Sequence, residues 1–155
     1  MRHLFFIALF LTGQLIYAQE NSTVDCSTGP ISTTFCYDTG LDNSYVFSSN
    51  DGTPLNLTID EGQVENGWDE FIVYDSDGVT ELTPTQPFYG NGGNLAGLSF
   101  QSSGDSITLL VDEDGSISCV SSGYTPITFT ISCATCINPT VDFEVVSDCL
   151  NGPQF

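Results

Sequence analysis

Short alternating segments separated by explicit turns are the feature that most constrains the fold of this 155-residue chain. Apolar and polar residues alternate one by one in several places, for example over residues 55–59 and 127–131. A period of two is typical of strands that bury one face, whereas a helix would repeat its apolar residues every three or four positions. Helical spacing is almost absent, so the chain is expected to be all-β.

The expected strands cover residues 55–59, 71–74, 98–100, 107–111 and 127–131. Clusters of Gly, Asn and Asp lie between them, at residues 50–52, 75–78, 90–94 and 112–115. These residue types favour tight turns because Gly accepts positive φ and Asx side chains bond to nearby backbone. Many short strands separated by such turns predict an antiparallel β-sandwich.

The first 18 residues are typical of a secretory signal peptide. Arg2 and His3 give a positive start, residues 4–16 form an apolar run, and Ala18 is a small residue at the expected cleavage site. The alternative is a membrane anchor, but the apolar run is shorter than the ~20 residues that a spanning helix needs. We therefore expect a secreted or cell-surface protein that is not inserted in a membrane once the signal is removed.

We expect the exported chain to consist of a sandwich domain, residues 19–133, and a tail, residues 134–155. The tail begins like a linker at Asn138 and Pro139 and then alternates again over residues 141–145. A lone strand cannot bury its own face. The tail either adds a strand to the sandwich or starts a second, incomplete module, and we favour the second interpretation.

Basic side chains are confined to Arg2 and His3, whereas all 20 Asp and Glu residues follow the leader. Loss of Arg2 with the leader moves the formal net charge from −19 to about −20. Without imidazole, amine or guanidinium groups, catalytic triads, Schiff bases and phosphate clamps are excluded. Nucleic acid is disfavoured as a partner because no cation would face its phosphates. Hard-cation binding and recognition by shape remain, and we expect no enzyme.

An even number of cysteines in an exported protein favours disulfide bonds. The six positions are Cys26, Cys36, Cys119, Cys133, Cys136 and Cys149. Cys26–Cys36 and Cys119–Cys133 are the pairs nearest in sequence, whereas a Cys26–Cys133 bond would tie the first strand to the last. A zinc site at Cys133 and Cys136 is the alternative, but it lacks a second close pair and a histidine.

Several short motifs occur in the order found in one extracellular family. An alternating strand leads to Val64-Glu65 and Trp68-Asp69, a strand then ends in the turn 75–78, and residues 113–116 and Gly123-Tyr124 precede the last strand. In these motifs, over roughly residues 26–133, the sequence resembles the CUB domain family. The resemblance implies a jelly-roll β-sandwich that acts as a non-catalytic module. Glu113 departs from the family pattern, which has a serine there.

The resemblance also implies a calcium site at one end of the sandwich. The expected ligands are Glu65, Asp69 and Asp114, with Ser116 or Asn66 and backbone carbonyls completing the shell. Asp112 rivals Asp114 because both flank the same turn. Ca²⁺ takes six to eight oxygens at about 2.3–2.6 Å, and clustered carboxylates repel unless a cation separates them. The alternative is that these carboxylates are solvated turn residues.

The function expected from these observations is a calcium-stabilised binding or adhesion module that presents an acidic surface to an extracellular protein or glycan. In the family, calcium often bridges to a basic side chain of the partner. One alternative is a carbohydrate-binding module of a larger extracellular enzyme or surface protein, which would show a row of exposed aromatics. Trp68, Tyr89 and Tyr124 are the candidates, although Trp68 is expected to pack across the sandwich edge.

Another alternative is a glycoside hydrolase that uses two carboxylates, since that chemistry needs no basic residue. No paired glutamate motif supports it. Asn21 and Asn56 each begin a glycosylation motif, which matters only in a host that glycosylates.

Overall fold

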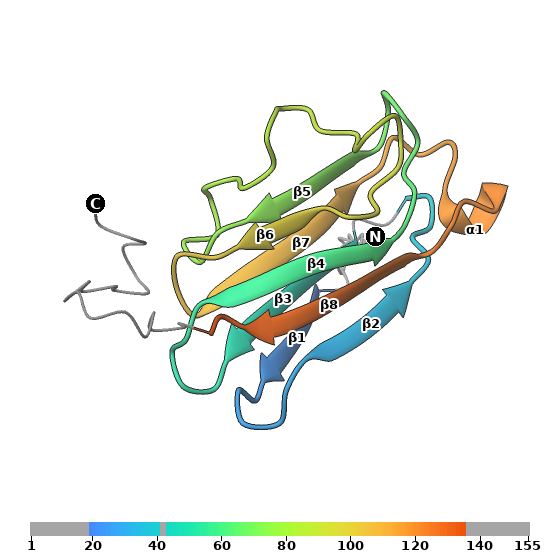
Figure 1. The fold of residues 1–155 in the computed structure, drawn as a ribbon. Coiled ribbons are helices and arrows are strands. Elements are labelled where there is room, and N and C mark those ends of the chain that lie inside the picture. The colour runs from blue at the N-terminus through green and yellow to red at the C-terminus, as the bar shows by residue number, and fades with distance from the viewer. Residues whose placement is uncertain (1–18, 41–42, 136–155) are drawn as a thin grey trace, which may run out of the picture.

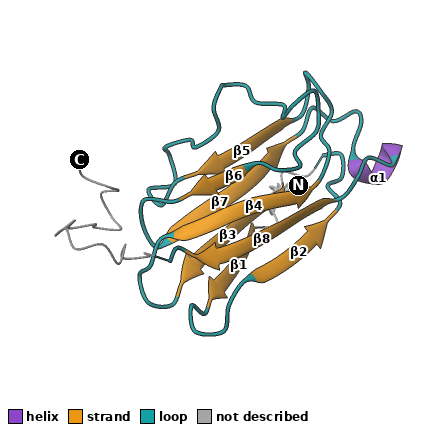
Figure 2. Cartoon of the chain, viewed as in Figure 1, coloured by secondary structure: helices purple, strands orange, loops and turns teal. Residues whose placement is uncertain are grey.

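The computed structural model describes residues 19–40 and 43–135, which form two packed β-sheets (Figure 1). The strands are β1 (Gln19–Val24), β2 (Ile31–Phe35), β3 (Asn43–Ser49), β4 (Leu55–Glu61), β5 (Glu70–Tyr74), β6 (Ser99–Gln101), β7 (Ser106–Asp112) and β8 (Ile127–Cys133). One helical turn, α1 (Cys119–Ser122), lies at one end of the sandwich (Figure 2). The predicted all-β sandwich is confirmed.

The first sheet has the strand order β1-β3-β7-β5 and the second sheet has the order β2-β8-β4-β6. All pairings are antiparallel except that of β1 with β3, which is parallel. The five expected strands correspond to β4, β5, β6, β7 and β8. The sequence pattern did not indicate β1, β2, β3 or α1.

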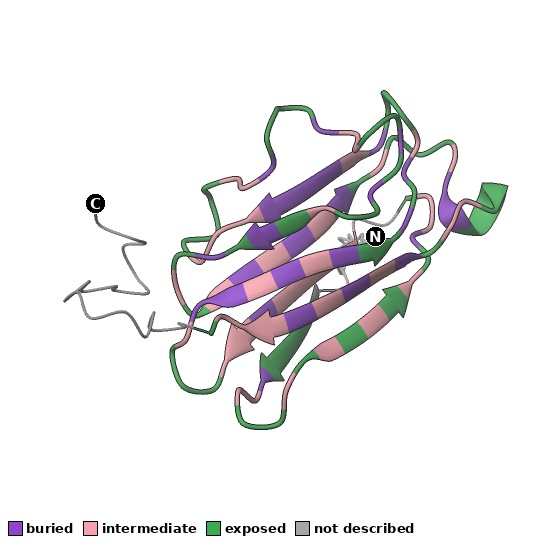
Figure 3. Ribbon diagram, in the orientation of Figure 1, coloured by how far each residue is buried: buried purple, intermediate pink, exposed green. Residues whose placement is uncertain are grey.

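The core lies between the inner faces of the two sheets. Along β4, β7 and β8, buried residues alternate with more exposed ones, as the banding of these strands in Figure 3 shows. Phe129 lies at the centre of an aromatic group, with ring centroids 5.6 Å from Phe47 and 6.0 Å from Tyr45. Both contacts are edge-to-face, the geometry that the ring quadrupoles prefer. Strands from both sheets thus share one apolar centre.

Two disulfides connect the beginning of the described chain to its end. Cys26 bonds to Cys133, and Cys36 bonds to Cys119, with Cα–Cα distances of 5.5 and 5.2 Å. The pairings nearest in sequence are therefore wrong, and the alternative that ties the first strand to the last is correct for Cys26 and Cys133. Because Cys133 is in a disulfide, it offers no thiolate for the zinc alternative.

The expectations for the leader, for Cys136 and Cys149, and for most of the tail fall outside the described residues and stay predictions. Among the residues that are described, no helix has the length and apolar character needed to cross a bilayer.

Candidate metal centre

The loop between β4 and β5 folds back on itself and so brings two carboxylates together. The backbone N–H groups of Trp68 and Asp69 both donate to the carbonyl oxygen of Glu65, at 3.2 and 3.0 Å. In return, the backbone N–H of Glu65 donates to Oδ2 of Asp69 at 3.4 Å. This turn places the side chains of Glu65 and Asp69 at the end of the sandwich.

Asp69 is fully buried, yet no basic side chain exists in the described chain to pair with it. Three donors face its carboxylate instead. The Tyr37 hydroxyl donates to Oδ2 at 2.7 Å, the backbone N–H of Asp114 donates to Oδ1 at 3.2 Å, and the Glu65 N–H is the third. Burying an ion is costly unless its hydrogen bonds are satisfied, so these donors hold Asp69 in one orientation.

Glu65, Asp69 and Asp114 form the candidate metal site. One carboxylate oxygen from each lies within 4.8 Å of the others. Glu65 is half-buried and Asp114 is exposed, so the group opens to solvent on one side. The Ser116 hydroxyl lies between them, 2.7 Å from Oδ1 of Asp114 and 3.5 Å from Oε2 of Glu65. Four side chains therefore direct hard oxygen atoms at one small volume.

The electrostatic consequence of this clustering is visible at Glu65. Loss of hydration, together with the negative charges of Asp114 and Asp69, raises the pKa of the Glu65 carboxyl. The shift has the direction expected when like charges are held together without a cation between them.

Tyr37 supports the site from the core side. Its side chain is fully buried, and its carbonyl oxygen accepts a hydrogen bond from the backbone N–H of Val120 in α1 at 3.2 Å. The neighbouring Cys36 is bonded to Cys119, which begins α1. Burial, and then the hydrogen bond to Asp69, raise the pKa of the Tyr37 hydroxyl, so it remains a donor. The sequence pattern does not indicate Tyr37 as part of the site.

Glu113 joins two loops at the same end of the molecule. Its carboxylate accepts from the backbone N–H of Gly40 at 2.6 Å and from that of Gly115 at 2.8 Å. The glutamate that departs from the family pattern therefore braces the turn that carries Asp114.

Of the remaining predicted ligands, Asp112 lies outside the group of three carboxylates, whereas Asn66 stays a prediction. Asp112 is the exposed last residue of β7, opposite Glu70 in the strand register, and is not part of the group of three carboxylates. Asn66 is exposed in the β4–β5 loop. Asp114 rather than Asp112 is thus the acidic residue of this turn that meets Glu65 and Asp69.

The carboxylates of the turn 75–78 accept hydrogen bonds from backbone N–H groups, both within the turn and, at Asp75, from Ser103. Asp77 accepts from the backbone N–H groups of Val79 and Thr80, and hydrogen bonds from Thr80 and Val79 lower the pKa of its carboxyl. Asp75 accepts from the N–H groups of Ser76 and Ser103. These contacts fit the expectation that both residues form turns.

Trp68 does not pack across the sandwich edge. Its side chain is 64% exposed, which contradicts the expectation, because the turn that buries Asp69 directs the preceding residue outward. Tyr124 packs against the core and Tyr89 is half-buried. The three aromatics therefore differ in exposure, and only Trp68 presents most of its ring to solvent.

No known family pattern and no curated protein matches the sequence. Solved structures nevertheless share the fold. The CUB1-EGF-CUB2 domains of rat MASP-1 match with a TM-score of 0.55 and 12% identity, over 83% of this chain and 49% of that one. The same region of human MASP-1/3 gives 0.51 and 16%, over 74% and 41%.

The full extracellular region of zebrafish Gpr126/Adgrg6 matches with a TM-score of 0.54 and 15% identity, over 77% of this chain and 15% of that one. The chain thus spans less than half the length of each of these three proteins. At such low identities the likeness concerns the fold alone. The fold is a CUB-like β-sandwich, as the sequence motifs predicted.

Proposed function

We propose that this protein is a secreted, non-catalytic binding module whose loop end is organised by calcium. The CUB-like fold and the two disulfides fit an extracellular module. The observation that best supports a bound metal is that carboxylate oxygens of Glu65, Asp69 and Asp114 lie within 4.8 Å of one another, with the Ser116 hydroxyl beside them. One of the three carboxylates is fully buried and none has a cationic partner among the described residues.

The donor set fits Ca²⁺ better than a transition metal. All side-chain donors are hard oxygens from loops, which suits a large, flexible oxygen shell, whereas zinc prefers nitrogen and sulfur ligands. Backbone carbonyls, water or a partner's oxygen atoms would supply the rest of the six to eight ligands. Loss of hydration and repulsion from Asp114 and Asp69 raise the pKa of Glu65, and the cation would offset the repulsion.

The partner is proposed to be an extracellular protein or glycan that meets this acidic surface. A chain with a formal charge of −19 attracts cationic groups and repels anionic ones. Association with a basic protein surface is therefore expected to be fast at low salt and slower at high salt. Nucleic acid and anionic membranes remain poor partners for the same electrostatic reason.

Thermal melting in CaCl₂ and in EDTA tests the calcium proposal. Calcium at a hundredfold excess over its dissociation constant is expected to stabilise the fold by about 2.7 kcal/mol. Asp114→Asn should remove most of that shift, because it keeps the size and the hydrogen-bond acceptor but loses the charge. Asp112→Asn is the matched control, two residues away, and should leave the shift intact. Equal melting midpoints in millimolar calcium and in EDTA would reject the metal site.

A further inference from the structure

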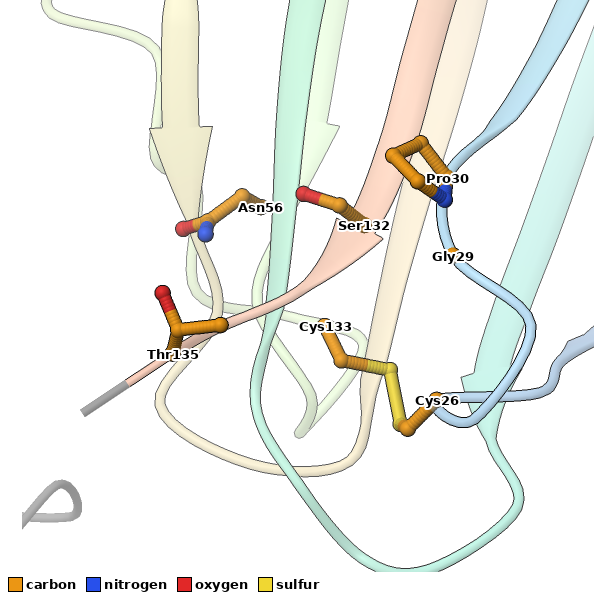
Figure 4. A pocket seen from close by; sticks show the side chains of 7 residues that line it. All are labelled: Cys26, Gly29, Pro30, Asn56, Ser132, Cys133 and Thr135. Atoms are coloured by element: carbon orange, nitrogen blue, oxygen red, sulfur yellow. A yellow bond between two sulfur atoms is a disulfide. The ribbon is translucent and has the colours of Figure 1, made fainter. Parts of the chain in front are cut away.

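A surface pocket of about 330 Å³ lies at the end of the second sheet where β4 begins and β8 ends (Figure 4). β4 runs from this pocket toward the loop that carries Glu65, so the two sites lie at opposite ends of the sandwich. The Asn56 amide and the hydroxyls of Ser132 and Thr135 line one side of the pocket, and Pro30 and the Cys26–Cys133 disulfide line the other. Its volume is at the lower end of the roughly 300–1,000 Å³ that small-ligand sites occupy.

The polar side chains of this pocket have no hydrogen-bond partner among the described residues. Within residues 19–40 and 43–135, the side chains of Asn56, Ser132 and Thr135 make no hydrogen bond to another residue. Further along the same sheet face some hydroxyls are used: Thr34 and Thr128 lie 2.9 Å apart, and Thr130 donates to Asp60 at 2.8 Å. Others, such as those of Thr58 and Ser99, make no hydrogen bond to a described residue. The pocket is therefore one part of a longer face that keeps donors and acceptors free.

The residues that line the pocket are uncharged in a strongly acidic chain, although the Asp51 carboxylate lies 3.2 Å from Sγ of Cys26. None of its lining residues is ionisable, since both cysteines are in the disulfide. It continues onto the outer face of the second sheet, where β2, β8, β4 and β6 direct Ser, Thr, Asn and Gln side chains to solvent. Asp60 and Glu61 are the only carboxylates on those four strands. The outer face of the first sheet differs, because it mixes apolar residues such as Val46 and Leu110 with acidic ones.

From this chemistry we propose that the outer face of the second sheet binds a neutral polysaccharide, with one sugar unit seated in the Asn56 pocket. A pyranose ring has hydroxyl groups around its edge and an apolar C–H face. The Asn56, Ser132 and Thr135 groups match the hydroxyls, and the Pro30 ring and the disulfide match the apolar face. The negative field of the molecule selects against anionic glycans. This site does not depend on calcium.

Native affinity electrophoresis of the full exported chain, made in a host that does not glycosylate Asn56, tests the proposal. The gels contain hydroxyethylcellulose, xyloglucan, galactomannan or laminarin as neutral probes, and alginate as the anionic probe. We expect at least one neutral polysaccharide to retard the protein and alginate not to retard it. Retardation in EDTA should equal that in calcium, which separates this site from the carboxylate cluster. Retardation by alginate alone, or by none of the probes, overturns the proposal.

Variants then locate the binding site. The pair Asn56→Ala with Ser132→Ala is expected to weaken binding at least tenfold. Asn56→Asp should have a similar effect, because it preserves shape but removes two donors and adds a charge. The matched control is Ser44→Ala with Ser48→Ala, on the outer face of β3 in the first sheet, which should bind like the parent chain. Unchanged retardation of both pocket variants, with melting temperatures like the parent's, overturns the assignment to this pocket.

Discussion

At the scale of single residues, Asp69 shows how a carboxylate is buried where the described residues include no basic side chain. Its carboxylate accepts from Tyr37 and from two backbone N–H groups rather than from a lysine or arginine. Neutral donors orient the carboxylate without cancelling its charge. The charge therefore still acts on Glu65 and Asp114, and this residual repulsion distinguishes the site from an ordinary structural hydrogen-bond network.

Glu65→Gln tests this repulsion through its pH dependence. The pKa of Glu65 is raised in the folded state, so its ionisation destabilises the calcium-free fold as pH rises through that raised pKa, and has no effect well below pH 4.5. The variant should therefore melt at a higher temperature than the parent in EDTA at pH 7, and at nearly the same temperature at pH 4. In calcium the order should reverse at pH 7, because the variant loses a ligand. A variant that is less stable than the parent in EDTA at pH 7 contradicts this account.

At the scale of elements, the loop 90–94 supports the β4–β5 loop that carries Glu65. The Gly93 carbonyl accepts from the backbone N–H of Val64 at 2.9 Å, directly before Glu65. Gly93 has φ +91°, and a Cβ there would lie 2.7 Å from the Val64 carbonyl oxygen. The position of Glu65 therefore depends on a close backbone contact that only glycine permits.

Gly93→Ala is expected to destabilise the fold and to weaken calcium binding, because the clash displaces Val64 and with it Glu65. Gly92→Ala is the matched control. Gly92 also has positive φ, at +64°, but a Cβ there meets nothing within 4 Å. Gly92→Ala should therefore lower the free energy of unfolding only by the cost of a left-handed backbone, roughly 1–2 kcal/mol. The free energy of unfolding measured in urea should be lower for Gly93→Ala than for Gly92→Ala by about 1–3 kcal/mol, the usual cost of overpacking. Equal calcium affinities in the two variants would argue against the bracing role.

Most of the strands that could be predicted from the sequence bury one face, whereas β5 was predicted as a compact apolar run and has three consecutive buried residues. In β4, β7 and β8 every second residue is buried, so their alternation is visible in the sequence. In β2 no residue is fully buried, and in β3 only Phe47 is, so neither strand has a clear apolar face. β1 lies at the edge of its sheet and pairs with one strand only. Most of its residues are exposed, so its sequence shows no regular apolar pattern.

The candidate site could be predicted in part. Asp112 continues the outward parity of β7, whereas the turn that follows brings the Asp114 backbone to Asp69, and spacing alone did not separate these two residues. Tyr37 was not predicted because its contact with Asp69 spans 32 residues and its loop has no periodicity. The outward orientation of Trp68 depends on the two backbone hydrogen bonds to the Glu65 carbonyl. These bonds could not be predicted from the pattern of residue types.

At the scale of the whole molecule, the two disulfides have similar loop lengths but different neighbours. Cys36–Cys119 closes 83 residues beside Tyr37 and α1, at the end with the candidate metal site, whereas Cys26–Cys133 closes 107 residues beside the Asn56 pocket. Cross-links over loops of this size restrict the unfolded chain by comparable amounts of entropy. Their contributions to stability should therefore be alike, while their contributions to the two sites should not.

Replacing each cysteine pair by serine separates these roles. Each double variant is expected to lose about 4–5 kcal/mol of unfolding free energy on the chain-entropy account, measured by urea denaturation. Calcium affinity should fall for the Cys36–Cys119 pair and stay unchanged for the Cys26–Cys133 pair. Polysaccharide retardation should follow the opposite pattern. A loss of both activities in both variants would mean that the two ends of the sandwich are not independent.

The same two bonds also affect how the domain would resist proteolysis. They form nested rings, one inside the other, so hydrolysis of any single peptide bond between Cys26 and Cys133 leaves both pieces covalently joined. Trypsin-like proteases, which cut after lysine or arginine, find no target at all beyond Arg2. A domain nicked in an exposed loop by some other protease would still migrate as one band until a reductant is added, and it would keep its strands in place while it is exposed to digestive enzymes.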